Sequence, residues 1–340
     1  MRMARHRQGW VLGVLAALVG LCAGCPQYAD PTVPESIVPL VEPASDAKYL
    51  LYTPSPYDAA RPTPLVILCH GTRPWDSPIR EIRDWVKLAE DKNFIVAAPS
   101  LTGTRGDFPP AAAKQIERQR DDEETILGVV RHVEGSKNID ETRVFLVGWS
   151  AGNYAVMHTG LRHPDIFRAV AGIQGNFDAA YMTDVTDAVD PYQPVLMLYG
   201  SADLLINKQV KECTAWLYDH DAYVIDNEVP GAHRSHPQTA YEFFERVVRE
   251  YPWLRLRAFT VDAAQPFTVQ FKTRASFEPV AFDWSFGDGE SSPVASPVHT
   301  YAKAGSYRVT LVVTMPNDKR LKRSATVTVP QNRVVSGLGN

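Results

Sequence analysis

The composition lacks the features that would assign the chain to a specialised class. Only four cysteines occur in 340 residues, which excludes a disulfide-dense scaffold. The formal net charge is −4, and because proteins that follow nucleic-acid phosphates carry a basic excess, we expect no nucleic-acid partner. With 45% hydrophobic and 22% charged residues, the chain also differs from disordered proteins. We therefore expect a globular protein with one large domain or two unequal ones.

One apolar run stands out, at the N-terminus. Three arginines precede the run over residues 10–21, and no acid occurs before Asp30. The run is shorter than the roughly 20 residues that span a bilayer, but it has the length of the core of a secretory signal. The segment therefore predicts export.

The run ends in LCAGC (21–25), which resembles the lipobox of bacterial lipoproteins. The resemblance implies that residues 1–25 are a lipoprotein signal peptide with its lipobox, and that Cys25 carries the lipid. The protein would then be membrane-anchored without a spanning helix, at the outer membrane, in the periplasm or on the cell surface. Cys22 departs from the family, which usually has Leu or Val there, so a plain secreted protein and an uncleaved anchor stay open.

The remaining cysteines are Cys69, in a strand-like apolar run, and Cys213, in a helix-like stretch. We expect two buried free thiols, with a disulfide as the alternative.

Three segments with different sequence patterns follow the expected signal. Residues 26–46 are rich in proline and acids and predict an extended tether. Over 47–255, short apolar runs alternate with amphipathic stretches, which predicts an α/β domain with a mostly parallel sheet and helices on both faces. Residues 256–330 alternate with period two and predict a small antiparallel sandwich, before a tail over 331–340. The strands expected in the α/β part are 65–70, 94–99, 143–150, 168–175, 194–200 and 222–229, and the helices are 79–91, 121–134, 151–163, 206–219 and 236–250.

The segment GWSAG (148–152) predicts a nucleophile elbow, because it follows a strand and opens a helix. Its glycines permit the tight turn that exposes Ser150 above the sheet. The N–H of Ala151 lies at the helix N-terminus, where it can stabilise an oxyanion. We expect the second oxyanion donor at Thr72 or a neighbour, after the turn at Gly71, and we expect His70 to be a hydrogen-bonding residue under that turn.

A serine nucleophile needs a base and an acid, and both follow in the order serine, acid, histidine. Asp203 follows the strand 194–200, and His233 follows the next strand, so both lie at the edge of the sheet that carries Ser150. His236 is an alternative base. Asp184, Asp187 and Asp190 are alternative acids, although a solvated loop face is the plainer interpretation.

Several motifs together resemble the α/β-hydrolase fold, and within it exported esterases related to polyhydroxybutyrate depolymerases, feruloyl esterases and dienelactone hydrolases. They are PLVILCHGT, DETRVFLVGWSAG, PVLMLYGSAD and PGAH, over about residues 48–250. The resemblance implies hydrolysis of carboxylic esters through an acyl-enzyme on Ser150, with Asp203 and His233 completing the triad and no metal or organic cofactor. Asn153 departs from the third glycine that these esterases often have, which leaves the subfamily open. Because residues 175–194 are too few for a large lid, we expect an open site suited to bulky, polymeric or glycan-linked esters.

The segments WSFGDG (284–289), PVHTY (297–301) and GSYRVTL (305–311) resemble the PKD domain, an immunoglobulin-like sandwich. Asp288-Gly289 supplies a turn with positive φ. PKD modules of exported hydrolases act as spacers or bind polysaccharide or protein. Two other functions stay open for the whole chain: a non-catalytic surface adhesin and a serine peptidase. A basic cluster, either a solvated hairpin or a contact for anionic polymers, comprises Lys319, Arg320, Lys322 and Arg323.

Overall fold

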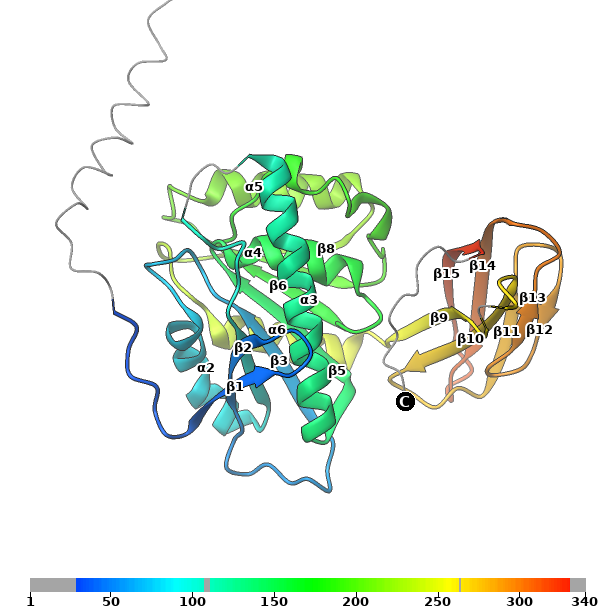
Figure 1. Ribbon diagram of the computed structural model, residues 1–340, viewed down its shortest axis with the longest axis horizontal. Coiled ribbons are helices and arrows are strands. Elements are labelled where there is room, and N and C mark those ends of the chain that lie inside the picture. The colour runs from blue at the N-terminus through cyan, green and yellow to red at the C-terminus, as the bar shows by residue number, and fades with distance from the viewer. Residues whose placement is uncertain (1–28, 107–110, 263, 331–340) are drawn as a thin grey trace, which may run out of the picture.

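The computed structural model describes residues 29–106, 111–262 and 264–330, which form two domains (Figure 1). We call residues 29–253 the large domain and residues 254–330 the small domain. The expected signal with Cys25 and the expected tail lie outside the described residues. Within the described part, no helix is both long enough and apolar enough to cross a membrane.

A single eight-stranded sheet is the centre of the large domain. Its strands are β1 (Ile37–Glu42), β2 (Ala47–Tyr52), β3 (Thr63–Cys69), β4 (Ile95–Pro99), β5 (Ile139–Trp149), β6 (Ala169–Ile173), β7 (Pro194–Gly200) and β8 (Tyr223–Val229). They lie in the order β1-β2-β4-β3-β5-β6-β7-β8. From β4 to β8 all neighbours are parallel, whereas β1 and β2 pair antiparallel at one edge. The predicted α/β class with a mostly parallel sheet is confirmed.

Helices cover both faces of this sheet. They are α2 (Pro78–Lys92), α3 (Ala112–Ser136), α4 (Gly152–Ala155) continued by the π-helix η1 (Val156–Gly160), α5 (Asn207–Asp219) and α6 (Pro237–Glu250). Successive residues of β3 enter two separate cores: Leu65 belongs to the core that includes residues of α3 and α5, and Val66 to the core that includes residues of α2 and α6. Because both faces are covered, the strand is apolar throughout. Cys69 and Cys213 are buried free thiols, as predicted, and burial raises the pKa of both.

The N-terminal boundary of the domain differs from the prediction. Residues 37–42, assigned to the tether over 26–46, form β1 and pair with β2 from Ile37–Tyr52 to Glu42–Ala47. Pro39 obscured the strand pattern, but an edge strand tolerates proline because half of its N–H groups need no partner. Helix α3 also begins at Ala112 and not at the predicted residue 121. The sequence pattern does not show this first part of the helix, because buried polar side chains, Gln115 and Gln119 among them, interrupt its apolar period.

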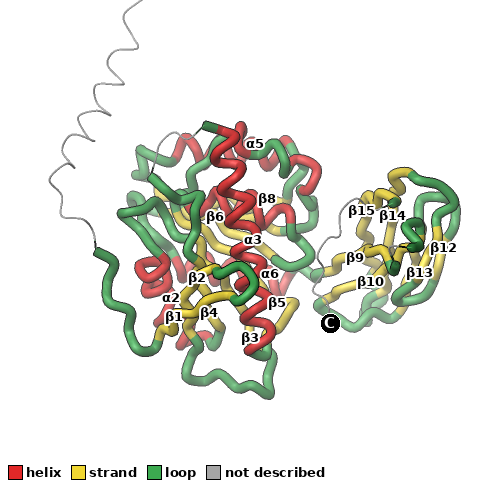
Figure 2. The backbone as a smooth tube through the Cα atoms, viewed as in Figure 1, coloured by secondary structure: helices red, strands yellow, loops and turns green. Residues whose placement is uncertain are grey.

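The small domain consists of two antiparallel sheets, as predicted. One contains β13 (Val298–Thr300), β10 (Thr268–Ala275) and β9 (Leu254–Thr260), and the other contains β12 (Ser291–Ser292), β11 (Ala281–Ser285), β14 (Gly305–Thr314) and β15 (Arg320–Val329). In Figure 2 this domain shows strands and loops only, in yellow and green. Trp284 and Phe286 are buried in its core. Gly289 has φ 100°, in keeping with the predicted turn.

Arginines of the small domain attach it to the large domain. Their partners all lie at or before the starts of β5, β6 and β7, which is the edge opposite to the one where these parallel strands end. The small domain therefore does not line the edge that carries Ser150. The contacts are Arg255 with Asp190 (3.1 Å), Arg257 with Asp165 (2.8 Å), Arg274 with Glu141, and Arg323 over the Tyr192 ring (4.0 Å).

This interface also divides the basic cluster of the hairpin. Arg323 is buried against the large domain, whereas Arg320 is exposed and lies 3.4 Å from Asp283. The four basic residues therefore do not share one surface.

Candidate active site

The turn between β5 and α4 has the geometry of a nucleophile elbow. Ser150 has φ 52°, in the left-handed region that costs a non-glycine residue energy. Its N–H donates to Ile173 O at 3.0 Å, which ties the turn to the end of β6. A Cβ on Gly148 would lie 2.5 Å from Gly152 O, and a Cβ on Gly152 would overlap the Cys69 carbonyl. The two glycines are therefore required by close backbone approach.

The structure brings Asp203 and His233 together. His233 Nδ1 lies 2.6 Å from Asp203 Oδ2, and the Asp203 side chain is 1% exposed. The other oxygen of this carboxylate accepts hydrogen bonds from Leu205 N and Ile206 N, each at 3.2 Å. These two N–H groups fix the orientation of the carboxylate, so the imidazole meets one defined oxygen.

Among the described side chains, the alternative base and acids make no hydrogen bond or ion pair with Ser150, Asp203 or His233. His236 is the residue before α6, and within the described residues its Nε2 has no hydrogen-bond partner. Asp184 contacts Arg120 Nε at 3.0 Å and His158 Nε2 at 3.4 Å, so it is part of a paired network and not of a solvated loop face. Asp190 pairs with Arg255 in the domain interface. The side chain of Asp187 lies outside the described part.

Ser150 Oγ donates a hydrogen bond to Asn176 Oδ1 at 3.3 Å. Within the described part of the chain, no hydrogen bond joins Ser150 to His233. The imidazole is nevertheless at the elbow, because its ring lies 5.0 Å from the ring of Trp149, the residue before the serine. A rotation about the Cα–Cβ bond of Ser150 is the movement that would redirect its hydroxyl.

The turn after β3 contains the N–H of Thr72, one of the two predicted oxyanion donors. Gly71 N donates to Asp76 Oδ2 at 2.5 Å, and Arg73 N donates to Thr104 O at 3.0 Å. Between them, Thr72 N donates to no residue of the described chain, and the same holds for Ala151 N at the start of α4. Both predicted oxyanion N–H groups are therefore available for a ligand.

His70 lies beneath this turn and is fully buried. Its Nε2 accepts a hydrogen bond from Leu101 N at 3.2 Å, so Nδ1 carries the proton and donates to Gly71 O at 2.9 Å. Burial lowers the pKa of His70 to about 4. The residue is thus a neutral hydrogen-bonding group, the role that the sequence suggested.

This burial predicts a pH-dependent contribution to stability. An unfolded His70 takes up a proton below pH 6.5, whereas the folded one does not until about pH 4. Its contribution is therefore complete above pH 6.5 and is lost as the pH falls to 4. The free energy of unfolding of the wild type, minus that of His70→Asn, is expected to fall by about 3 kcal/mol between pH 7 and pH 4.

Urea denaturation of both proteins at the two pH values measures this difference. Asp122, whose pKa burial raises to about 6, has the opposite pH dependence, but it is common to both proteins and cancels. An equal difference at pH 7 and pH 4 would contradict the neutral state of His70.

Four polar residues near the site were not predicted to act there, and they connect its parts. Asn153 Nδ2 donates to Asn176 O at 2.9 Å, and Gln209 Oε1 accepts from Asn176 Nδ2 at 3.1 Å. A Cβ on Gly175 would lie 2.5 Å from that of Asn153, so the asparagine that departs from the esterase pattern fits against a glycine. The fourth residue is Gln174. The signal available in the sequence was the polar segment QGN (174–176) directly after a strand.

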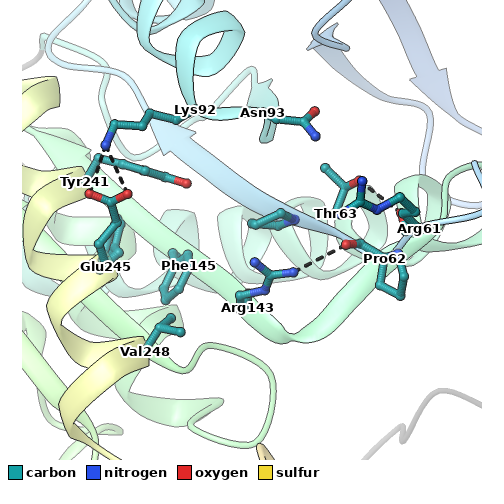
Figure 3. Close-up of a pocket in the computed structure, with 12 residues that line it drawn as sticks. Arg61, Pro62, Thr63, Lys92, Asn93, Arg143, Phe145, Tyr241, Glu245 and Val248 are labelled. Carbon is teal, nitrogen blue, oxygen red and sulfur yellow. Dashed lines mark hydrogen bonds and ion pairs between the residues drawn. The ribbon is translucent and has the colours of Figure 1, made fainter. Parts of the chain in front are cut away.

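A cavity of about 420 Å³ lies away from this site (Figure 3). It is lined by the start of β3, by Asn93 before β4, and by α6, and the ion-paired Lys92 and Glu245 are among its lining residues. Because β3 and β4 begin there, the cavity is at the edge opposite to Ser150. Among the described residues, no group of three or more His, Cys, Asp or Glu side chains is arranged to hold a metal ion.

Comparisons with known proteins found matches for both domains. Residues 82–222 match the model of the prolyl oligopeptidase family, and residues 255–329 match the PKD domain. A ferulic acid esterase of Anaeromyces mucronatus superposes with a TM-score of 0.50 at 16% identity, covering 65% of this chain and 94% of that one. A dipeptidyl peptidase 4 of Porphyromonas gingivalis gives 0.46 at 16% identity, over 64% of this chain and 35% of that one.

A collagenase, ColQ1 of Bacillus cereus, is 42% identical over 65 residues, which are 18% of this chain and 7% of the collagenase. The chain therefore spans a small part of that relative and about a third of the dipeptidyl peptidase. At these identities the structural likeness shows the fold. Together with the family matches, it shows that the chain combines an α/β-hydrolase domain of the serine hydrolase superfamily with a C-terminal PKD domain.

Proposed function

We propose that the chain is a serine esterase that cleaves carboxylic esters, with Ser150 as nucleophile, His233 as base and Asp203 as the acid that orients it. The observation that carries the proposal is the 2.6 Å contact between His233 and a buried, backbone-fixed Asp203, at the sheet edge where Ser150 stands in an elbow with φ 52°. These are the parts that acyl transfer needs.

The reaction follows from the placement of protons. His233 Nδ1 donates to Asp203, which leaves Nε2 free to accept the proton of Ser150 as Oγ attacks the ester carbonyl. The N–H groups of Thr72 and Ala151 stabilise the oxyanion. The imidazolium then protonates the departing alcohol, and water, deprotonated by the same imidazole, releases the acid from Ser150.

The surroundings support a bulky or polymeric ester. The segment between β6 and β7 contains just two short helices within the described residues, η2 (Ala179–Tyr181) and η3 (Thr186–Ala188), and the His233 side chain is 27% exposed. Trp75, just after the oxyanion turn, is 56% exposed. The PKD domain, attached at the opposite edge, would act as a spacer or bind polysaccharide or protein, away from the reacting bond.

Export and membrane attachment through a lipid on Cys25 are proposals that rest on the sequence before residue 29. Peptide hydrolysis is a second candidate, which the match to the prolyl oligopeptidase family favours. The same triad serves both reactions, so substrate comparison decides between them.

The test begins with the full chain and a fluorophosphonate probe, which we expect to label the wild type. Turnover is then compared for p-nitrophenyl acetate, methyl ferulate, acetylated xylan and polyhydroxybutyrate, and for proline-containing p-nitroanilide peptides. We expect kcat/KM for at least one ester to exceed that for every peptide by at least about 100-fold, since the pocket must discriminate by transition-state contacts. Peptide cleavage that matches or exceeds ester cleavage would replace the esterase by a peptidase, and absence of labelling would overturn both.

A further inference from the structure

Gln174 occupies a central place in the site although it does not belong to the triad. It directly follows β6 and is fully buried. Its φ is 46°, so the backbone is held in the left-handed region without glycine. Its N–H donates to Leu198 O of β7 at 2.6 Å. The residue is thus fixed between the elbow of Ser150 and the strand that leads to Asp203.

The Gln174 side chain reaches the loop that carries His233 and binds it on both sides of the histidine. Nε2 donates to Ala232 O at 2.8 Å, and Oε1 accepts from Arg234 N at 2.6 Å. The backbone carbonyl can only accept and the backbone N–H can only donate, so the orientation of the amide is unambiguous. A side chain with one donor and one acceptor is needed to make both bonds.

The histidine loop needs such a support because little else holds it. It follows β8, an edge strand, and Gly231, Ala232 and Arg234 are exposed. Among the described residues, the backbone of the loop is otherwise tied by Ala202 N, which donates to Gly231 O at 2.8 Å. Among the described residues, Asp203 is the hydrogen-bond partner of the imidazole and the Trp149 ring is its aromatic neighbour, and a loose loop would let Nε2 move relative to Ser150.

We propose that Gln174 is a positioning residue that holds His233 in reach of both Asp203 and Ser150. The inference rests on the proposed roles of these three residues. Gln174 touches no substrate in this account: it acts by fixing the main chain on either side of the base. Displacement of a catalytic group by about 1 Å can reduce the rate about 100-fold, so two hydrogen bonds at this point matter for turnover.

The test compares Gln174→Met with a matched control, Gln193→Met. Gln193 is also fully buried, and its Nε2 donates to Gly160 O at 3.1 Å and Phe167 O at 2.7 Å, but it lies before β7, at the edge opposite to the site. Methionine keeps the length of each side chain and removes its hydrogen bonds. Both variants are expected to lower Tm, because each leaves buried backbone groups unpaired.

With p-nitrophenyl acetate as substrate, Gln174→Met is expected to lower kcat by about 10- to 100-fold with KM within twofold, because acylation and deacylation both use His233. Gln193→Met is expected to leave kcat within twofold. If Gln174→Met does not fold, Gln174→Asn serves instead: its uncharged amide is one methylene shorter, cannot reach both Ala232 O and Arg234 N, and should show a smaller loss in kcat.

A readout independent of activity is the downfield proton resonance of the short bond between His233 Nδ1 and Asp203. We expect it to broaden or disappear in Gln174→Met and to persist in Gln193→Met. Equal kcat losses in the two variants would overturn the proposal while leaving the esterase intact. Failure of the wild type to react with fluorophosphonate would overturn the proposed function. Separately, an unchanged resonance in Gln174→Met would overturn the positioning role of Gln174.

Discussion

Ser150→Ala is expected to lower kcat/KM for p-nitrophenyl acetate by about 10⁴- to 10⁶-fold and to abolish fluorophosphonate labelling. The substitution removes the one atom that forms the covalent bond to the acyl group, while the oxyanion N–H groups of Thr72 and Ala151 remain. Residual hydrolysis would come from these groups and from substrate binding.

The fold should tolerate this change. Ser150 Oγ makes a single long hydrogen bond, 3.3 Å to Asn176, and alanine at φ 52° is strained much as serine is. An unchanged Tm would therefore show that the loss is chemical. Ser201→Ala, at an exposed serine after β7, is the control and should keep full activity. Comparable loss in both variants, or undiminished turnover in Ser150→Ala, would remove Ser150 from the mechanism.

The sequence could predict the elbow because its requirements are local. Two glycines around a serine, between an apolar strand and a helix, are needed wherever the backbone approaches as closely as Gly152 does to Cys69. The placement of Asp203 and His233 followed from a topological rule, since residues after parallel strands gather at one edge of the sheet. Both inferences use spacing along the chain, which the sequence contains.

The sequence could not predict groups whose roles depend on contacts between distant segments. In the sequence, Gln174 is an ordinary polar residue after a strand, and no neighbouring residue indicates that its amide forms hydrogen bonds with the backbone of Ala232 and Arg234. Likewise the pattern of residues 37–42 predicts a tether, because the pairing of β1 with β2, and not its own pattern, makes it a strand. The arginine contacts between the domains also join distant segments, so the sequence could not predict them.

The domain interface and the candidate active site lie at opposite edges of the large sheet. The arginine contacts of the small domain lie where β5 to β7 begin, and Ser150, Asp203 and His233 lie where strands end. Arg255 is buried, and breaking its pair with Asp190 would leave a buried charge without a partner, so this contact favours the orientation of the two domains. A surface bound through the PKD domain would therefore lie away from the catalytic edge, which leaves that edge open to a separate polymer chain.

Asp203→Asn is expected to lower kcat by about 10³- to 10⁴-fold at pH 7, because it reverses the tautomer of the base. In the wild type, one carboxylate oxygen accepts from Leu205 N and Ile206 N, and the other accepts from His233 Nδ1. An asparagine oxygen would stay with the two N–H groups, since turning the amide would lose two bonds to keep one. Its NH₂ would then face Nδ1, so the imidazole proton would move to Nε2, the atom that must accept the proton of Ser150.

The same argument makes asparagine at least as damaging as alanine, although it is closer in size. Asp203→Ala removes the support of the imidazolium but leaves the tautomer free, so part of the population retains an unprotonated Nε2. We expect kcat for p-nitrophenyl acetate to be equal or higher in Asp203→Ala than in Asp203→Asn, at comparable Tm. Asp221→Asn, at an exposed turn residue with φ 57° before β8, should retain full activity as the control. Near-wild-type turnover in Asp203→Asn would show that another group orients His233, because the asparagine NH₂ cannot accept the proton of Nδ1 and a different acceptor would have to hold it there.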